Sequence, residues 1–339
     1  LGSDRCSVYL YYEELHDIKI NVSNPSYLLG GYTKSITNCA NASWDYKLNG
    51  IVIDSINGNT KCDLSLTPKT PNNEELLTTI VNNKATRDEN GKRYQGKNPD
   101  NYVWFNDELW RIIGNIPVCL ESGCSTMENR VKIIRNYSIG GSGNGLTSHK
   151  WEYNNVRILL NTCYLGKASS CEGYCNTSFG SGSTFGNCDY SSIGIDTNNF
   201  YGKMIEDVYF NIGETGLGLN STEDTATVFY NKEIATRTTE TYKIGLMYAS
   251  DFGYATENYN GVLGNPSQSL VDKNWLFLYR YDWTMTADSS NYAYLVSGFY
   301  GNLKNTQSAG DLRPALYLKS NIYVLSGTGT KQDPYIIGT

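Results

Sequence analysis

The sequence contains only two histidines, which limits the catalytic chemistry available to it. A Ser-His-Asp or Cys-His arrangement needs a histidine within reach of the nucleophile. His16 follows two glutamates near the start of the chain, and His149 precedes an amphipathic segment. Neither lies in a nucleophile-elbow pattern. We therefore predict that the protein is not an enzyme and has no catalytic residues.

Charged residues are also scarce, at 18%, and no long apolar run is present. The net charge of −6 is spread along the chain without a basic run, so neither nucleic acid nor an anionic membrane is an expected partner. No segment approaches the roughly 20 consecutive apolar residues of a membrane span. An export signal or anchor is expected to lie outside the given sequence.

Motifs for cofactors and metals are weak. The glycine-rich segment at 140–145 lacks the Lys-Ser/Thr pair of a phosphate-binding loop. Adjacent acids such as Glu206-Asp207 point to different faces of a helix, which disfavours a glycosidase pair without excluding one. The Asp/Asn loop beginning at Asp196 leaves Ca²⁺ as an option, although its spacing does not match an EF-hand. We expect no cofactor, with Ca²⁺ as the alternative.

Tyrosine, glycine and cysteine are abundant instead. The 28 tyrosines and 33 glycines, together with many Asn, Ser and Thr residues, supply polarity without charge. This composition is typical of a secreted or surface protein rich in β-structure. The length of 339 residues allows two domains, and we expect an extracellular, cell-surface location.

Nine cysteines lie mostly in loops rich in Gly, Ser and Asn, which indicates disulfides. Zinc is the competing interpretation because Cys171 and Cys175 have nearly finger-like spacing, but no second close pair and no nearby His completes four ligands. We predict that Cys6 is unpaired, and that the disulfides join Cys39 to Cys62, Cys119 to Cys124, and Cys163, Cys171, Cys175 and Cys188 among themselves, in one of three connectivities.

Short alternating runs fill the chain from Tyr9 to about Pro68 and predict a small antiparallel β-sandwich over 5–69. Asn-Gly pairs at 49–50 and 57–58 indicate hairpins. Thr70-Pro71 has the pattern of an N-cap followed by proline at the first helical position, which predicts a connecting helix over 70–84.

The rest of the chain, 85–339, is predicted to form a second domain of the α+β class. Strand patterns occur at 102–114 and 130–135 and return at 242–248 and 313–318. Helical spacing lies between them, at positions around Ile158, Met204 and Val228, the last after a capping-box-like Ser221-x-x-Asp224. Strands, then helices, then strands indicate α+β without regular βαβ alternation.

The segment 272–311 has the most unusual composition, with tyrosines interleaved with Asn, Asp and Ser. Tyr, Ser, Gly and Asn dominate antibody paratopes, since Tyr offers large contact area at low entropy cost. The alternative is an aromatic-rich β-meander that fills the core, and it is favoured for Trp275 and Trp283.

Several strings together resemble an uncharacterised family of surface domains from low-GC gut Firmicutes, whose members often follow a prepilin-like or lipoprotein anchor. They are YVWFNDELWRIIG (102–114), VKIIR (131–135), KIGLMYASDFGYA (243–255), WTMT (283–286), LRPALYLKS (312–320) and the ending GTGTKQDPYII (327–337). A Trp-rich segment before a terminal Arg-Pro-aliphatic strand is similar to C-type-lectin-like domains, including the variable proteins of diversity-generating retroelements. Residues 5–68 resemble the small β-sandwich repeats that precede such domains.

The resemblance implies a small β-sandwich followed by a C-type-lectin-like domain at 85–339 that displays a variable, adhesin-like binding face on a cell surface. The partner would be a protein or glycan on another cell or on a phage. Two alternatives stay open: a structural pilus or envelope subunit, and a secreted enzyme on a lectin-like fold. Such folds carry unrelated functions.

We place the binding face on the outward side of the 272–311 strands, because alternation turns about half of the side chains outward. Trp275, Trp283 and Met285 belong to the family-like strings and are assigned to the core. The predicted ligand contacts are Tyr279, Tyr281, Asn291, Tyr292, Tyr294, Phe299, Tyr300 and Asn302.

Overall fold

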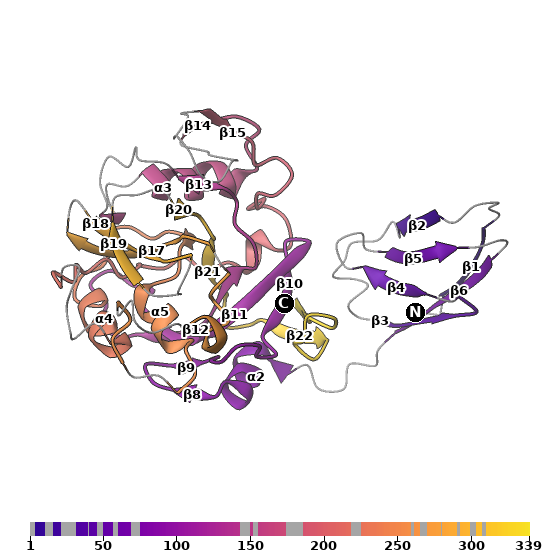
Figure 1. Cartoon of the computed structure of the whole chain (residues 1–339), viewed down its shortest axis with the longest axis horizontal. Coiled ribbons are helices and arrows are strands. Elements are labelled where there is room, and N and C mark those ends of the chain that lie inside the picture. The colour runs from indigo at the N-terminus through magenta and orange to yellow at the C-terminus, as the bar shows by residue number, and fades with distance from the viewer. Residues whose placement is uncertain are drawn as a thin grey trace. The chain divides into compact units, whose positions relative to one another are not determined.

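The computed structural model shows a mixed α+β protein (Figure 1). The chain divides into two compact units, of which the first comprises Leu1–Leu77, Tyr102–Leu109 and Tyr323–Thr339, and the second comprises Thr78–Asn101 and Trp110–Ile322. The structure describes residues 4–10, 16–21, 32–39, 41–45, 50–56, 60–68, 75–142, 150–151, 155–173, 186–217, 225–258, 261–264, 270–278, 280–289, 292–298, 303–306 and 310–339.

Six strands of the first unit, here called the N-terminal sheets, form two antiparallel sheets of three strands each. One has the order β1-β6-β3, with β1 at Asp4–Leu10, β6 at Thr60–Pro68 and β3 at Tyr32–Thr37. The other has the order β2-β5-β4, with β2 at His16–Asn21, β5 at Gly50–Ile56 and β4 at Ala42–Asp45. Alternation predicted strands from Tyr9 to about Pro68, and all of these strands lie in that span except β1, which begins earlier, at Asp4.

The two Asn-Gly pairs have different outcomes. β4 and β5 are antiparallel neighbours, with Asp45 opposite Gly50, so a hairpin joins them as predicted, although Gly50 is itself the first residue of β5. The hairpin predicted at 57–58 is wrong, because β5 and β6 belong to different sheets. A turn signal fixes a local reversal of the chain and does not decide which strands pair.

The first unit also contains short strands from three later segments of the chain. Here β10 (Tyr102–Phe105) pairs with β23 (Tyr335–Gly338), β23 pairs with β22 (Tyr323–Ser326), and β22 pairs with β7 (Glu75–Leu76). These pairings differ from the predicted boundaries at 69, 84 and 85, since they group residues from three separate segments. Asn106 and Asp107 both have positive φ, the conformation of a two-residue type I′ turn after β10.

A helix, α2, covers Leu77–Lys84 within the predicted connecting segment. Leu77 and Val81, four residues apart, are fully buried, so they share one apolar face. The predicted N-cap at Thr70-Pro71 lies outside the described residues.

In the second unit one sheet has the order β16-β21-β12-β11, with β9 on β11 and β8 on β9. A register shift in β11 falls between Ile112 and Gly114, and a Cβ on Gly114 would lie 2.2 Å from the Lys92 carbonyl oxygen, so only glycine fits there. The strands are β8 (Arg87–Asp88), β9 (Lys92–Arg93), β11 (Glu108–Val118), β12 (Glu128–Arg135), β16 (Ile244–Gly245) and β21 (Ala315–Tyr317).

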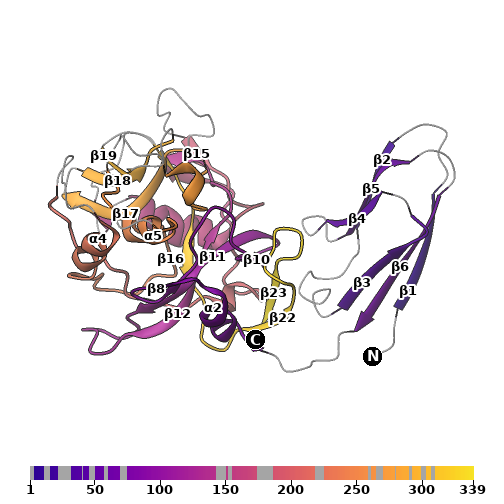
Figure 2. The same cartoon turned by 60° about the horizontal axis from the view of Figure 1, so that its bottom comes forward.

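A second sheet of this unit contains five strands in the order β13-β20-β17-β18-β19. Figures 1 and 2 both show α4 and α5 beside its strands. The strands are β13 (Gly141–Ser142), β20 (Gly310–Asp311), β17 (Asp282–Ser289), β18 (Tyr292–Val296) and β19 (Leu303–Thr306). The short stretch from β20 to β21 therefore supplies one strand to each sheet of the unit.

Helices of this unit are short. The helix predicted around Val228 is confirmed as α4, and Thr225 is its N-cap, with a side chain that accepts a hydrogen bond from the Val228 N–H. The helix predicted from Met204 to Val208 is wrong: a single 3₁₀ turn ends there, and isolated bridges follow. The helices are α3 (Asn155–Ile158), η2 (Leu159–Cys163), η3 (Tyr164–Gly166), η4 (Gly202–Met204), α4 (Ala226–Glu233), α5 (Ala249–Tyr254) and η5 (Val271–Lys273). None of the helices in the described part of the chain is long and apolar enough to cross a membrane.

Disulfides join the predicted partners wherever the structure describes both. Cys39 is bonded to Cys62 and Cys119 to Cys124, and Cys163 pairs with Cys171 from within its predicted group. Cys188 is disulfide-bonded as well and stands opposite Cys171 in the small β14–β15 ladder, β14 at Cys171–Gly173 and β15 at Gly186–Cys188. Cys175 lies outside the described residues.

Candidate functional site

Two strands expected to carry the binding face, β17 and β18, are buried on both sides. In β17 every residue from Asp282 to Asp288 is buried, and in β18 only Tyr292 is exposed. The prediction that half of these side chains face outward is wrong. Alternating side chains point to the two faces of a sheet, and a face is exposed only if no other element packs on it. Here α4 and α5 contribute to covering the sheet (Figure 2).

Tyr294 needs a correction, because its side chain is only 2% exposed. Its ring makes an edge contact with Phe229 of α4, with centroids 4.9 Å apart. Its hydroxyl accepts a hydrogen bond from Thr215 Oγ1 and donates one to Asp288 Oδ1. It therefore belongs to the core and not to a surface. The core positions predicted for Trp275, Trp283 and Met285 are confirmed.

Two of the predicted contacts reach the surface. Tyr292 is 39% exposed at the start of β18, and Tyr281 is half-buried just before β17. The Tyr281 ring lies over Gly298, where an added Cβ would be 3.2 Å from it. The other predicted contacts lie outside the described residues: Tyr279, Asn291, Phe299, Tyr300 and Asn302.

A charged cluster lies beside Tyr281. The exposed Arg280 pairs with the buried Asp311 at 3.2 Å, and the Tyr281 carbonyl accepts the Asp311 N–H at 2.5 Å. A second ion pair lies next to it. The buried Arg313 pairs with Asp282 of β17 at 3.0 Å and donates to the Leu276 carbonyl at 2.6 Å. Burial, reinforced by the Asp311 charge, raises the pKa of Asp282 to about 6, against the opposing effect of Arg313.

The arginine of the Arg-Pro-aliphatic string thus has an internal role. Arg313 is 3% exposed and links β17 to the segment around Leu276. Its ion pair explains why an arginine is buried just before the apolar strand β21.

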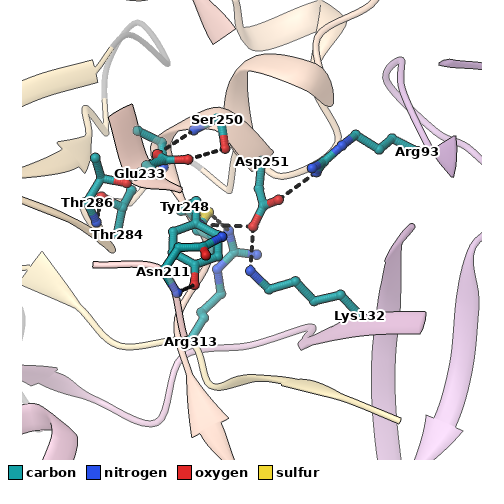
Figure 3. A network of polar contacts seen from close by, with 12 residues as sticks. Arg93, Lys132, Asn211, Glu233, Tyr248, Ser250, Asp251, Thr284, Thr286 and Arg313 are labelled. Carbon is teal, nitrogen blue, oxygen red and sulfur yellow. Dashed lines mark hydrogen bonds and ion pairs between the residues drawn. The ribbon is translucent and has the colours of Figure 1, made fainter. Parts of the chain in front are cut away.

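The densest polar cluster of the unit surrounds Asp251, the third residue of α5 (Figure 3). Its Oδ1 accepts from Arg93 Nη1 at 2.7 Å, and its Oδ2 accepts from Lys132 Nζ at 2.6 Å and from the Tyr248 N–H at 2.9 Å. Asp251 is 1%, Lys132 0% and Arg93 2% exposed. We call these three residues the Asp251 triad.

Aromatic rings enclose the cations of the triad. Lys132 Nζ lies 4.0 Å from the centroid of the Tyr248 ring and 5.4 Å from that of Tyr317, and the Arg93 guanidinium lies 4.7 Å from the Tyr254 ring. Ring faces stabilise cations that have lost their water. Burial nevertheless lowers the pKa of Lys132, while for Asp251 the two cations outweigh burial and hold its pKa below the usual range.

Glu233 forms a second buried carboxyl cluster at the end of α4 (Figure 3). It accepts hydrogen bonds from the Ser250 N–H at 3.2 Å, from the Ser250 hydroxyl, and from Thr286 Oγ1 at 2.6 Å. Thr286 in turn accepts the Ala249 N–H at 2.9 Å, so Glu233 joins α4 to α5 and β17. Burial raises the pKa of Glu233 to about 7.

Sequence reasoning missed both clusters, although one signal was present. Lys132 interrupts an apolar strand between Val131 and Ile133, and all three are buried. A lysine in such a strand needs a partner carboxylate in the interior. The sequence could not identify that partner, because Asp251 is 119 positions away.

The calcium alternative receives no support at its own loop. The Asp196 carboxylate accepts the Asn198 N–H at 2.8 Å and so closes the turn. In the described part of the chain no three His, Cys, Asp or Glu side chains gather as metal ligands.

Comparison with protein-family models, with curated proteins and with solved structures finds no match to this chain. What the protein does is therefore inferred from its own residues.

Proposed function

We propose that this chain is a cell-surface, extracellular binding protein that recognises a protein or glycan ligand through exposed residues at the two ends of the β17–β18 ribbon, with Tyr281 at one end and Tyr292 at the other. The observation that carries the proposal is a contrast in exposure. The groups with the most perturbed chemistry, Asp251, Lys132 and Glu233, are at most 2% exposed, so no substrate in solution reaches them. Tyr292 and Arg280, at the ends of the same ribbon, are exposed.

Rigid support favours recognition at the Tyr281 end of the ribbon. The Tyr281 backbone is fixed by the hydrogen bond that its carbonyl accepts from the Asp311 N–H. The strand that follows, β17, is buried on both faces. Aromatic side chains on a rigid frame lose little conformational entropy on binding, which is why they dominate recognition surfaces.

The proposed architecture is a small β-sandwich followed by a C-type-lectin-like domain. In support of the sandwich, Ile51 and Ile53 of one N-terminal sheet and Leu64 of the other belong to a single apolar cluster. In support of the lectin-like domain, the Arg-Pro-aliphatic segment contributes β21 to one sheet, directly after β20 of the other sheet. The disulfides support an oxidising, extracellular location.

A structural envelope or pilus subunit is the second candidate. Its specific support is that the aromatic residues described within 272–311 are mostly internal, with Trp275, Trp283 and Tyr294 all at most 4% exposed. A purely structural protein would use these side chains only for stability.

A binding assay separates the two candidates. We would label the chain fluorescently and apply it to an array of bacterial and mammalian glycans and to fixed bacterial cells, together with Tyr281→Ala/Tyr292→Ala. Each buried anchor in an interface contributes about 2 kcal/mol, or roughly thirtyfold in Kd. The double variant should lose binding while keeping its melting temperature.

Tyr137→Ala is the matched control, since Tyr137 is 58% exposed and lies outside the ribbon. It should bind like the unmodified chain. Equal binding by all three proteins would contradict the proposed face, and the absence of binding to any probe would favour the structural candidate.

A further inference from the structure

Lys132 and Asp251 are arranged differently from the other lysine–aspartate pairs of this unit. Lys92–Asp88, Lys97–Asp272 and Lys243–Asp207 are equally close, at 2.5 to 2.6 Å, but in each of them the aspartate side chain is at least 55% exposed. Lys132 and Asp251 are 0% and 1% exposed. Water competes for the exposed pairs and does not reach the buried one.

The interior favours a nucleophilic amine at Lys132. Burial lowers the pKa of its ammonium group, so the uncharged amine with its free electron pair is more accessible than at the surface. The rings of Tyr248 and Tyr317 lie 4.0 and 5.4 Å from the group and restrict its movement. Since Nζ is 2.6 Å from Oδ2, it also lies close to Cγ, the carbon to which that oxygen is bonded.

The two oxygens of Asp251 are distinguished by their partners. Oδ1 is held by the Arg93 guanidinium at 2.7 Å, a donor that stabilises negative charge on that oxygen. Oδ2 receives Lys132, which can transfer protons to it, and the Tyr248 N–H. The carboxyl group therefore has one oxygen suited to stay as a carbonyl and one suited to leave as water.

We propose that Lys132 and Asp251 condense into an intramolecular amide that links β12 to α5. The Lys132 ammonium first transfers one proton to Asp251 Oδ2, which gives a neutral amine beside a neutral carboxyl group. The Nζ electron pair then forms a bond to Cγ, and the Cγ–Oδ2 bond breaks. Oδ2 leaves as water with two protons from the ammonium group, and the third proton stays on the amide nitrogen. An ammonium and a carboxylate thus become an amide and one water, so charge and atoms balance without an oxidant or co-reactant.

Glu233 acts here as a positioning residue. Its carboxyl group holds the Ser250 N–H and hydroxyl, and Ser250 precedes Asp251 in the first turn of α5. This contact fixes the turn that presents the Asp251 carboxyl to Lys132. Thr286 of β17 anchors Glu233 from the other side.

The amide has a consequence for stability. It closes a loop between residues separated by 119 positions, and it replaces two buried charges with a neutral group. Cross-links of this length restrict the unfolded chain strongly. This inference concerns the interior and does not depend on the proposed ligand.

Intact-mass spectrometry of the full chain tests the proposal. The protein would be reduced, alkylated and denatured so that disulfides do not affect the mass. We expect a mass lower than the sequence mass by one water, and a tryptic branched peptide that joins the Lys132 segment to the Asp251 segment. A full sequence mass together with cleavage after Lys132 in the denatured protein would overturn the proposal.

Two variants and an internal control sharpen the result. Asp251→Asn loses ammonia instead of water, so its cross-linked product must have the same mass as the cross-linked unmodified chain. Lys132→Arg keeps the cation, removes the nucleophile and should show its full sequence mass. Lys92, beside Asp88, should be cleaved normally in every sample; condensation there as well would show an unspecific dehydration and contradict the role of burial.

Discussion

The N-terminal sheets and the second unit are stabilised in different ways. The N-terminal sheets have a small apolar cluster, in which Ile51, Ile53, Cys62 and Leu64 are the buried members among the described side chains, and one disulfide passes through it. The second unit has a large interior that contains whole charged side chains such as those of the Asp251 triad.

Size explains the difference. A small domain buries a smaller fraction of its surface, so the disulfide through its apolar cluster contributes a larger share of its stability than Cys119–Cys124 and Cys163–Cys171 do in the larger unit. A large core supplies enough stability to tolerate buried ions, whose loss of hydration opposes their attraction. We infer that a larger core depends less on a cross-link and tolerates more buried charge. Each part of this inference can be tested in its own region.

The largest effect is expected from Asp251→Ala. This change removes the proposed Lys132–Asp251 cross-link and leaves Arg93 and Lys132 in the interior without their shared partner, and an unpaired buried charge alone costs about 3–5 kcal/mol. Chemical denaturation followed by tryptophan fluorescence should show the loss. The control is Asp88→Ala, whose side chain is 74% exposed and whose removal should change stability by less than about 0.5 kcal/mol. Similar losses in both variants would contradict the comparison.

Removal of the Cys39–Cys62 disulfide should come next. Cys39→Ala/Cys62→Ala removes a cross-link that spans 23 positions and should destabilise the N-terminal sheets by about 2–4 kcal/mol. Hydrogen exchange should quicken in 32–68 and stay unchanged in 282–296. Cys119→Ala/Cys124→Ala, which opens a span of only 5, is the control with the smaller effect. Faster exchange throughout the chain would show that the two regions are not independent in this respect.

A third prediction concerns pH. The pKa of Glu233 is about 7 in the folded protein against an ordinary 4.5, so between these values the folded state binds more protons than the unfolded state. This contribution to stability is complete below about pH 4.5 and is lost as the pH rises to about 7. Asp282, with a pKa of about 6, acts in the same direction.

Glu233→Gln removes this titration while keeping a group that can bond Ser250 and Thr286. The unmodified chain should lose on the order of 2 kcal/mol between pH 5 and pH 8 in denaturant titrations of the second unit. The variant should lose clearly less. Parallel pH profiles would show that the Glu233 carboxyl ionises normally despite its burial.

Part of this fold could be predicted from sequence because its signals are local. Alternation located the strands of the N-terminal sheets, helical spacing located α4, and cysteine spacing located the disulfides. The Asn57-Gly58 hairpin failed since strand pairing depends on distant partners, which a turn signal does not contain.

The candidate site was less predictable for the same reason. Which face of β17 is covered depends on α4 and α5, and which charges are internal depends on contacts such as Arg93 with Asp251, 158 positions apart. Alternation also says nothing about depth along a strand. Tyr292 and Tyr294 have the same parity in β18, yet one is 39% and the other 2% exposed.

These two tyrosines give the smallest and most closely matched prediction. Tyr294→Phe removes a hydroxyl that lies 3.3 Å from Thr215 Oγ1 and 3.5 Å from Asp288 Oδ1 inside the protein, which should cost about 1 kcal/mol. Tyr292→Phe removes a hydroxyl at an exposed position and should leave the free energy of unfolding within about 0.5 kcal/mol of the unmodified chain. Urea denaturation of both variants under one condition measures the difference. Because the residues share a strand and a face, only their depth separates them, and equal effects would mean that Tyr292 also belongs to the core and is unavailable to a ligand.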